Sequence, residues 1–115
     1  MRKVRDPRAV EPADAIRDVG PKTIELLKKR IADARFILWN GTLGVYEHGF
    51  TKGTEEIAKA IGRSKAAAVI GGGDTVASVD RLGLESKSLF LSTGGGAMLE
   101  YLSEGTLPGI EALRT

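Results

Sequence analysis

The sequence contains no cysteine, a single histidine and few aromatic residues, and these shortages exclude several kinds of function. Without cysteine there is neither a disulfide framework nor a thiol nucleophile. One histidine without clustered partners argues against a structural zinc site. No apolar run approaches the roughly 18 residues of a membrane span, and residues 1–12 have no apolar segment of the signal-peptide kind. We therefore expect a cytoplasmic protein without a membrane partner.

The chain also lacks an excess of charge of one sign. Seventeen Lys and Arg residues stand against fifteen Asp and Glu residues in a chain of 115, which leaves a formal net charge of +2. Because the positive and negative charges nearly cancel, the composition does not indicate a basic surface for nucleic acid. We therefore expect no nucleic-acid partner. At this length the chain supports one domain at most.

Glycine is what the sequence has in abundance, with fifteen residues, and many of them lie at a few junctions. Two junctions are triplets, at 71–73 and 94–96, and each lies between a short apolar run and a helix-like segment. A third junction, Asn40 and Gly41, ends another apolar run. Glycine is costly to order, so triplets at such places need a physical reason.

Apolar spacing predicts alternating helices and strands after an irregular lead-in of residues 1–17. We expect helices at 22–33, 54–61 (with Thr54 as its cap), 74–82 and 97–105, strands within 35–41, 66–73 and 88–96, a loop at 42–53, and a terminal turn from 107. This alternation predicts the α/β class with right-handed crossovers. Three strands are few, so we expect a partial piece of a larger doubly wound, three-layer α/β/α sheet of Rossmann-like form. An open strand edge then favours a homo-oligomer.

The glycine junctions all fall at the carboxyl ends of the expected strands, which is where open α/β sheets bind ligands. Glycine exposes backbone amides with no Cβ in the way, and a following helix adds its positive dipole end, so both features suit phosphate. Asp74 offers an oxygen to a phosphate-bound Mg²⁺, and Thr75 offers a hydroxyl donor. Neither triplet matches the P-loop or the dinucleotide fingerprint.

Simpler interpretations account for the same residues. A glycine run after a strand is often no more than a tight turn, and an aspartate at a helix start is often its N-cap. Glu47 in a glycine-framed loop is either solvated or bonded to a sugar hydroxyl. His48 is expected to be a solvated loop residue, and Trp39 a core residue.

Six segments, in this order, resemble the last part of phosphoglycerate kinase: DVGPKT, WNGTLGVYE, FTKGTEEIAKAI, IGGGDTVASV, STGGGAMLEYL and LPGIEAL. The resemblance runs from about residue 15 to residue 113. It implies that residues 18–115 are the C-terminal part of a nucleotide-binding domain.

Members of this family transfer a phosphoryl group reversibly between ADP and the acyl phosphate of 1,3-bisphosphoglycerate in glycolysis, so the resemblance implies ATP or ADP as ligand with Mg²⁺ as cofactor. In this family the 3-phosphoglycerate site lies in an N-terminal domain, which the resemblance implies is not among these 115 residues. We therefore expect no kinase activity from the 115 residues alone. The alternative is a non-catalytic α/β module that binds nucleotide or phosphate weakly, or that self-associates.

By resemblance, nucleotide contacts are expected at Asn40, Gly41, Thr42, Val45, Glu47, Gly72, Gly73, Asp74 and Thr75. Glu47 is expected at the ribose hydroxyls, Val45 near the adenine and Asp74 on the side of the Mg²⁺. The catalytic positions are expected at Gly94, Gly95 and Gly96, where amides and a helix start receive the phosphoryl group in transit. Thr42 stands where the family usually has proline.

Overall fold

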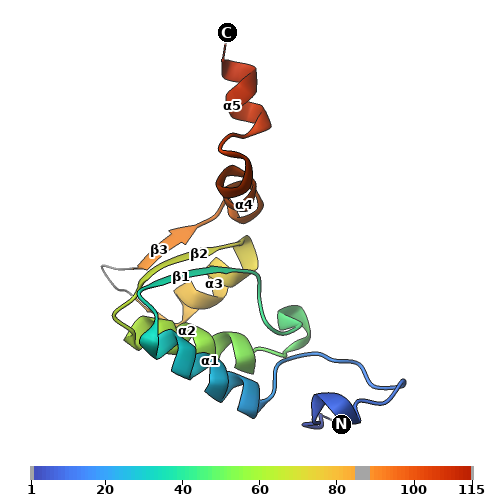
Figure 1. Ribbon diagram of the computed structural model, residues 1–115. Helices are drawn as coiled ribbons and strands as arrows, with labels where there is room; N and C mark the ends of the chain where they lie inside the picture. Colours follow the sequence, from blue (N-terminus) through green and yellow to red (C-terminus); the bar gives the residue numbers. More distant parts are fainter. Residues whose placement is uncertain (1, 85–88, 115) are drawn as a thin grey trace.

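The computed structural model describes residues 2–84 and 89–114, and Figure 1 shows three strands with helices below and above them. The elements are η1 (Pro7–Ala9), α1 (Pro21–Asp33), β1 (Phe36–Asn40), η2 (Tyr46–His48), α2 (Lys52–Arg63), β2 (Ala67–Gly71), α3 (Gly73–Arg81), β3 (Leu89–Ser92), α4 (Gly95–Glu104) and α5 (Pro108–Leu113), where η is a 3-10 turn. The predicted alternation of helices and strands, and with it the α/β class, is confirmed. Residue 88, the expected start of the third strand, lies outside the described residues.

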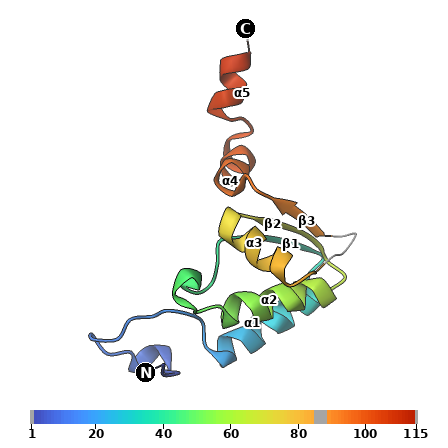
Figure 2. The ribbon, with the colours of Figure 1, turned by 180° about the vertical axis from the view of Figure 1, so that it is seen from behind.

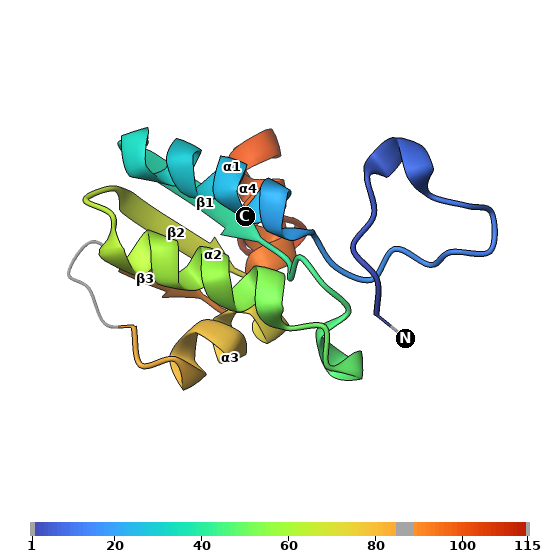
Figure 3. The ribbon, with the colours of Figure 1, turned by 90° about the horizontal axis from the view of Figure 1, so that it is seen from below.

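The three strands form one parallel sheet in the order β1-β2-β3, which is also their order in the chain. Helix α2 connects β1 to β2, and α3 connects β2 to β3. Because both crossovers run in the same direction and right-handed connections are the rule, both helices lie on the same face of the sheet. Figure 3 shows this face, with α1 beside α2 and α3 next to them.

The hydrophobic core lies between this face and the helices. Trp39 from β1 and Ile70 from β2 are paired in the strand register, and both side chains belong to this core. Ile70 is fully buried. The helices contribute Ile24 and Ile31 from α1, Ile57, Ala58 and Ile61 from α2, and Val79 from α3. Burying a large aliphatic side chain contributes about 1.5–3 kcal/mol, so this cluster holds the helices on the sheet. Trp39 is thus a core residue, as predicted.

Helix α2 begins two residues earlier than predicted, and Thr54 is therefore not its cap. Thr54 lies inside the first turn, where it is buried, and its hydroxyl accepts a hydrogen bond from the Leu43 backbone N–H at 3.0 Å. The loop between β1 and α2 uses that hydroxyl as its partner, which is a tertiary contact that a capping pattern does not reveal. The helix also extends two residues beyond the predicted end, through Gly62 to Arg63.

Residues 108–113 form a short helix, α5, where a turn was predicted. Pro108 stands in its first turn, a position that suits proline because its missing N–H has no helical partner there. Helices α4 and α5 extend away from the carboxyl end of the sheet, on the side opposite α1 and α2 (Figures 1 and 2). Among the described residues, no helix has the length and apolarity that crossing a membrane requires.

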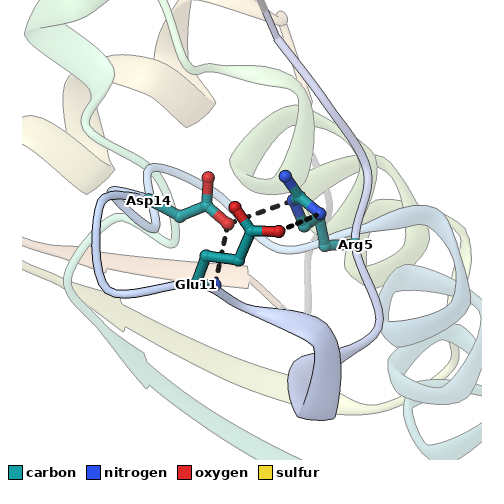
Figure 4. A network of polar contacts seen from close by, with 3 residues as sticks. All are labelled: Arg5, Glu11 and Asp14. Carbon is teal, nitrogen blue, oxygen red and sulfur yellow. Dashed lines mark hydrogen bonds and ion pairs between the residues drawn. The ribbon is translucent and has the colours of Figure 1, made fainter.

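The lead-in is irregular but carries its own polar network. Arg5 Nε lies 3.0 Å from Asp14 Oδ2 and Arg5 Nη1 lies 3.6 Å from Glu11 Oε1, and the Glu11 N–H donates to the same Asp14 carboxylate (Figure 4). Arg2 reaches further, donating to the Gly49 carbonyl at 3.0 Å with its guanidinium 4.2 Å from the centre of the Phe50 ring. The lead-in is thereby attached to the loop that contains η2.

Candidate functional site

The carboxyl ends of the three strands meet in one row. The strand register pairs Asn40 at the end of β1 with Gly71 at the end of β2, and Gly71 with Ser92 at the end of β3. The residues that follow each strand therefore come together at one edge of the sheet. These junctions contain both glycine triplets and Gly41.

The Asn40 side chain lies between the two glycine turns. A Cβ atom placed on Gly71 or Gly72 would stand 3.1 Å or 3.2 Å from Asn40 Oδ1, which is closer than normal contact. A Cβ on Gly95 would collide both with Asn40 Oδ1 and with the Gly72 backbone nitrogen. The backbones of the two turns therefore touch, and Gly95 is required at this point because any side chain would separate them.

Two helices begin at this contact. Helix α3 starts at Gly73, after Gly72 with φ +94°, and α4 starts at Gly95, after Gly94. Neither start receives a hydrogen bond from a capping side chain among the described residues. The first N–H groups of a helix have no partner within it, and the helix dipole is positive there, so an anion is the natural ligand. Asp74 lies inside α3 and does not cap it, although a capping role was one interpretation of the sequence.

Thr75 adds an unpaired hydroxyl beneath the first of these turns. Its side chain is completely buried, and its Oγ1 makes no hydrogen bond with any described residue. Oγ1 would lie 3.5 Å from a Cβ on Gly72, so the glycine turn covers it directly. A buried hydroxyl without a partner costs about 1–3 kcal/mol, which makes Thr75 a group that a ligand oxygen would satisfy.

A cavity of about 570 Å³ opens beside the start of α3, between this helix and η2. It is lined by Tyr46 and Glu47 from η2 and by Asp74 and Arg81 from α3. The Arg81 guanidinium lies 5.6 Å from the centre of the Tyr46 ring, within the range of a cation–π contact. Glu47 and Asp74 were expected at the site from the sequence, and the structure places both at the same cavity.

Sequence reasoning missed Tyr46 and Arg81 as site residues. Asp74 and Arg81 are seven residues apart, which is about two helical turns, so they share one side of α3. That spacing was the available signal for Arg81. No sequence signal identified Tyr46, because its position at the cavity depends on how η2 lies against α3.

Other expected site residues shape the loop that leads to the cavity. The Trp39 indole N–H donates to the Gly41 carbonyl at 2.7 Å, and the Thr42 hydroxyl donates to the Gly44 carbonyl at 3.1 Å. The Val45 N–H donates to the Arg17 carbonyl at 2.9 Å. None of the three expected residues here, Gly41, Thr42 and Val45, lines the described cavity. His48 is exposed, as predicted.

The two outer glycines of the second triplet have room around them. A Cβ on Gly96 would meet nothing within 4 Å, and one on Gly94 would touch no atom closer than 3.9 Å. Both residues are exposed, whereas Gly95 between them is buried. The start of α4 is therefore tight on its inner side and open to a ligand on its outer side.

A Mg²⁺ ion would have one carboxylate at the start of α3, that of Asp74. The described residues contain no group of three or more His, Cys, Asp or Glu side chains that would hold a metal ion. Mg²⁺ usually keeps several waters and binds through one or two carboxylates together with substrate phosphates. An exposed aspartate in the first turn of an uncapped helix fits that manner of binding and does not fit a metal held by protein alone.

Comparisons with known proteins agree on one family. The family model described as phosphoglycerate kinase matches residues 1–105. The phosphoglycerate kinases of Leptospira biflexa and Rubrobacter xylanophilus are 56% and 50% identical over 97 residues, which is 84% of this chain and 24% and 25% of theirs. The structure of phosphoglycerate kinase from Coxiella burnetii matches 96% of this chain and 29% of that chain, with a TM-score of 0.81 and 41% sequence identity.

The chain spans about a quarter of the length of the curated relatives that it matches. The match extends through both glycine triplets and the strands that precede them, since the family model runs from residue 1 to residue 105. The order of the elements, the parallel sheet and these similarities lead to the same conclusion. This chain belongs to the phosphoglycerate kinase family.

Proposed function

We propose that the chain carries the nucleotide-phosphate part of a phosphoglycerate kinase site and binds ADP or ATP with Mg²⁺. The observation that carries this proposal is the unpaired, buried hydroxyl of Thr75 at the place where two uncapped helix starts meet. Hydroxyl and amide donors gathered at one point, with no internal acceptor for the hydroxyl, favour a phosphate group as the ligand.

In this proposal the phosphates lie across the outer sides of the two glycine turns. The amides at the start of α3, from Gly72 and Gly73 onward, receive the nucleotide phosphates. The amides at Gly94, Gly95 and Gly96 receive the phosphoryl group in transit. The Thr75 hydroxyl is enclosed, so a phosphate reaches it when the turn over it shifts, and a turn made of three glycines is able to shift.

The cavity between η2 and α3 suits the nucleoside and its metal. Glu47, which lines the cavity, accepts hydrogen bonds from the ribose hydroxyls, and Asp74 faces the Mg²⁺ that the nucleotide brings. Arg81 holds the Tyr46 ring by a cation–π contact and so keeps η2, with Glu47 on it, against α3. Asn40, Gly41, Thr42 and Val45 complete the nucleotide contacts from the β1 loop.

Phosphoryl transfer itself needs groups beyond this chain. In the proposed reaction a terminal phosphate oxygen of ADP takes the phosphoryl group from the carboxyl oxygen of 1,3-bisphosphoglycerate, which gives ATP and 3-phosphoglycerate. Catalysis of this kind depends on positioning and on neutralising the charge of the moving group. The described site offers amides and one arginine, so we propose that the chain works in the cytoplasm as part of a glycolytic kinase and is inactive alone.

Titration with MgADP, followed by the NMR amide shifts of the chain, tests the proposal. We expect binding weaker than micromolar, with the largest shifts at the starts of α3 and α4. Thr75→Val removes a buried hydroxyl that has no internal partner, so it should raise the free energy of unfolding, by up to about 1–3 kcal/mol, and weaken MgADP binding at least about tenfold, as for a lost hydrogen bond to a charged group.

Thr54→Val is the matched control, because Thr54 is an equally buried threonine whose hydroxyl is used. It leaves the Leu43 N–H without its partner and should lower the free energy of unfolding by about 1–3 kcal/mol, while MgADP affinity of the folded protein is retained. If Thr75→Val binds MgADP as the unmodified chain does, or if the amide shifts lie elsewhere, the proposed site is wrong.

A further inference from the structure

The Asp18 carboxylate, just before α1, contacts both ends of the loop that carries η2. Its Oδ2 accepts a hydrogen bond from the Gly53 N–H at 3.1 Å, where the loop enters α2, and its Oδ1 accepts from the Val19 N–H at 2.8 Å. A Cβ atom on Gly44, near the other end of the loop, would stand 2.9 Å from the same Oδ1 and would collide with the Phe50 carbonyl. The carboxylate therefore lies between the two ends of the loop.

The two glycines that meet this carboxylate have no room for a side chain. Gly44 and Gly53 are both buried, and a Cβ on Gly53 would collide with Asp18 Oδ1. The neighbouring backbone adds a further contact, because the Val45 N–H donates to the carbonyl of Arg17 at 2.9 Å. Residues 17–18 thus hold the loop from outside it, where the chain passes η2 on its way to α1 (Figure 1).

The middle of this loop forms one wall of the cavity. Tyr46 and Glu47 belong to η2 and line the cavity, opposite Asp74 and Arg81 of α3. A single 3-10 turn of three residues does not fix its own position, because it has too few hydrogen bonds of its own. The place of Glu47 relative to α3 therefore depends on how the two ends of the loop are held.

We propose that Asp18 is a positioning residue for nucleotide binding: it holds η2 where Glu47 faces the ribose, a role that rests on the proposed function. Both of its carboxylate oxygens accept backbone N–H groups. An amide side chain has one oxygen acceptor and one NH₂ donor. Asp18→Asn therefore keeps the size of the side chain but sets a donor against a donor, and one of the two contacts is lost.

Amide hydrogen exchange of the nucleotide-free chain, followed by NMR, tests whether Asp18 holds the loop. In Asp18→Asn the Val45 and Phe50 amides should exchange about tenfold faster, as for the loss of about one hydrogen bond that keeps the loop closed. The Ile70 amide in the central strand should stay as protected as before. Asp14→Asn is the matched control, because Asp14 loses the same charge and also accepts a backbone N–H, but its contacts lie within the lead-in.

Titrations with MgADP and with magnesium pyrophosphate test the role in binding. Asp18→Asn should weaken MgADP binding about tenfold, as for a lost hydrogen bond to a charged group, and should leave the affinity for magnesium pyrophosphate unchanged, because pyrophosphate has no nucleoside. Removing a negative charge would by itself favour an anionic ligand, so weaker binding reports a change of position. In a Glu47→Gln background Asp18→Asn should have little further effect, since both act on one contact.

Circular dichroism shows whether each variant is folded, and Asp18→Ser, which keeps an oxygen acceptor, replaces Asp18→Asn if that variant is not. Equal weakening for MgADP and magnesium pyrophosphate would show a general structural role and would overturn the proposal. Unchanged MgADP binding in Asp18→Asn, or loop exchange like that of the unmodified chain, would overturn it as well while leaving the proposed function standing. If the unmodified chain binds no MgADP, the proposed function fails, and the positioning role of Asp18 fails with it.

Discussion

Gly95 and Gly96 are neighbours in the sequence and have opposite surroundings. Gly95 is buried where the Asn40 side chain and the Gly72 backbone come together, whereas Gly96 faces open space. Backbone atoms do not move aside as a flexible side chain does, so the restriction at Gly95 is steric. At Gly96 the absence of a side chain keeps an amide accessible. One glycine of the triplet therefore serves the fold, and its neighbour is free to serve a ligand.

Gly95→Ala should consequently destabilise the protein, by about 1–3 kcal/mol as for other overpacked positions. Gly96→Ala should stabilise α4 by about 0.5–1 kcal/mol, since alanine is the better helix former and nothing obstructs its Cβ. Urea unfolding of the two variants measures both effects. Equal stabilities would contradict the close contact between the two glycine turns.

At the scale of whole elements, one ion pair links the two helices that carry much of the core. Lys28 Nζ on α1 donates to Glu56 Oε2 on α2 at 2.6 Å, and Lys59 lies 3.8 Å from the other carboxylate oxygen. The hydrogen bond from Lys28, and then its charge, lower the pKa of Glu56 below its usual 4.5. The pair is partly exposed, so its contribution to stability is modest.

This lowered pKa predicts how stability depends on pH. A carboxylate whose pKa is lower in the folded state stabilises the protein above its unfolded value, and the contribution is lost as pH falls through the folded value. Glu56→Gln should therefore lower the free energy of unfolding at pH 7 by less than about 1 kcal/mol. The difference from the unmodified chain should disappear as the pH falls below 4.5.

Denaturant unfolding at several pH values measures this difference. Glu25→Gln is the control, because Glu25 is an exposed carboxylate on α1 that forms no ion pair among the described residues. A Glu56→Gln effect that stays constant down to low pH would show that the loss comes from packing and not from the charge.

At the scale of the whole molecule, the sheet has one covered face and a site at its carboxyl edge. The proposed role of this site is to position a nucleotide, but the described residues present few cationic side chains to it, with Arg81 at the cavity. A phosphoryl group in transit carries several negative charges that must be neutralised from more than one side. The geometry supports binding more than catalysis.

The chain alone should thus show no phosphoglycerate kinase turnover above background in an assay coupled to 1,3-bisphosphoglycerate consumption. A full-length relative, such as the Leptospira biflexa enzyme, serves as the positive control in the same buffer. Turnover that co-purifies with the chain and disappears in Gly95→Ala would contradict this expectation, since a contaminating enzyme would not respond to the substitution.

Local sequence predicted those parts of the molecule that depend on local rules. Strands β1 and β2 are apolar runs that end at glycine, and α1 follows the 3.6-residue period, so all three were predictable. The role of Thr54 was not predictable, because its hydrogen-bond partner Leu43 lies eleven residues away across a loop. The contact of Tyr46 with Arg81 depends on how η2 lies against α3, and no local pattern encodes that. Asp74 was anticipated from its place after the first glycine triplet, and Glu47 through the family resemblance.

The order of the strands bears on how the chain folds. Because the strands are paired in the order in which they occur, each new strand joins the one before it after a single crossover. The entropy of closing such loops grows slowly with length, and pairings close in sequence are made faster than distant ones. The site at the carboxyl edge also depends on the last of these elements, because α4 brings Gly95 against Gly72.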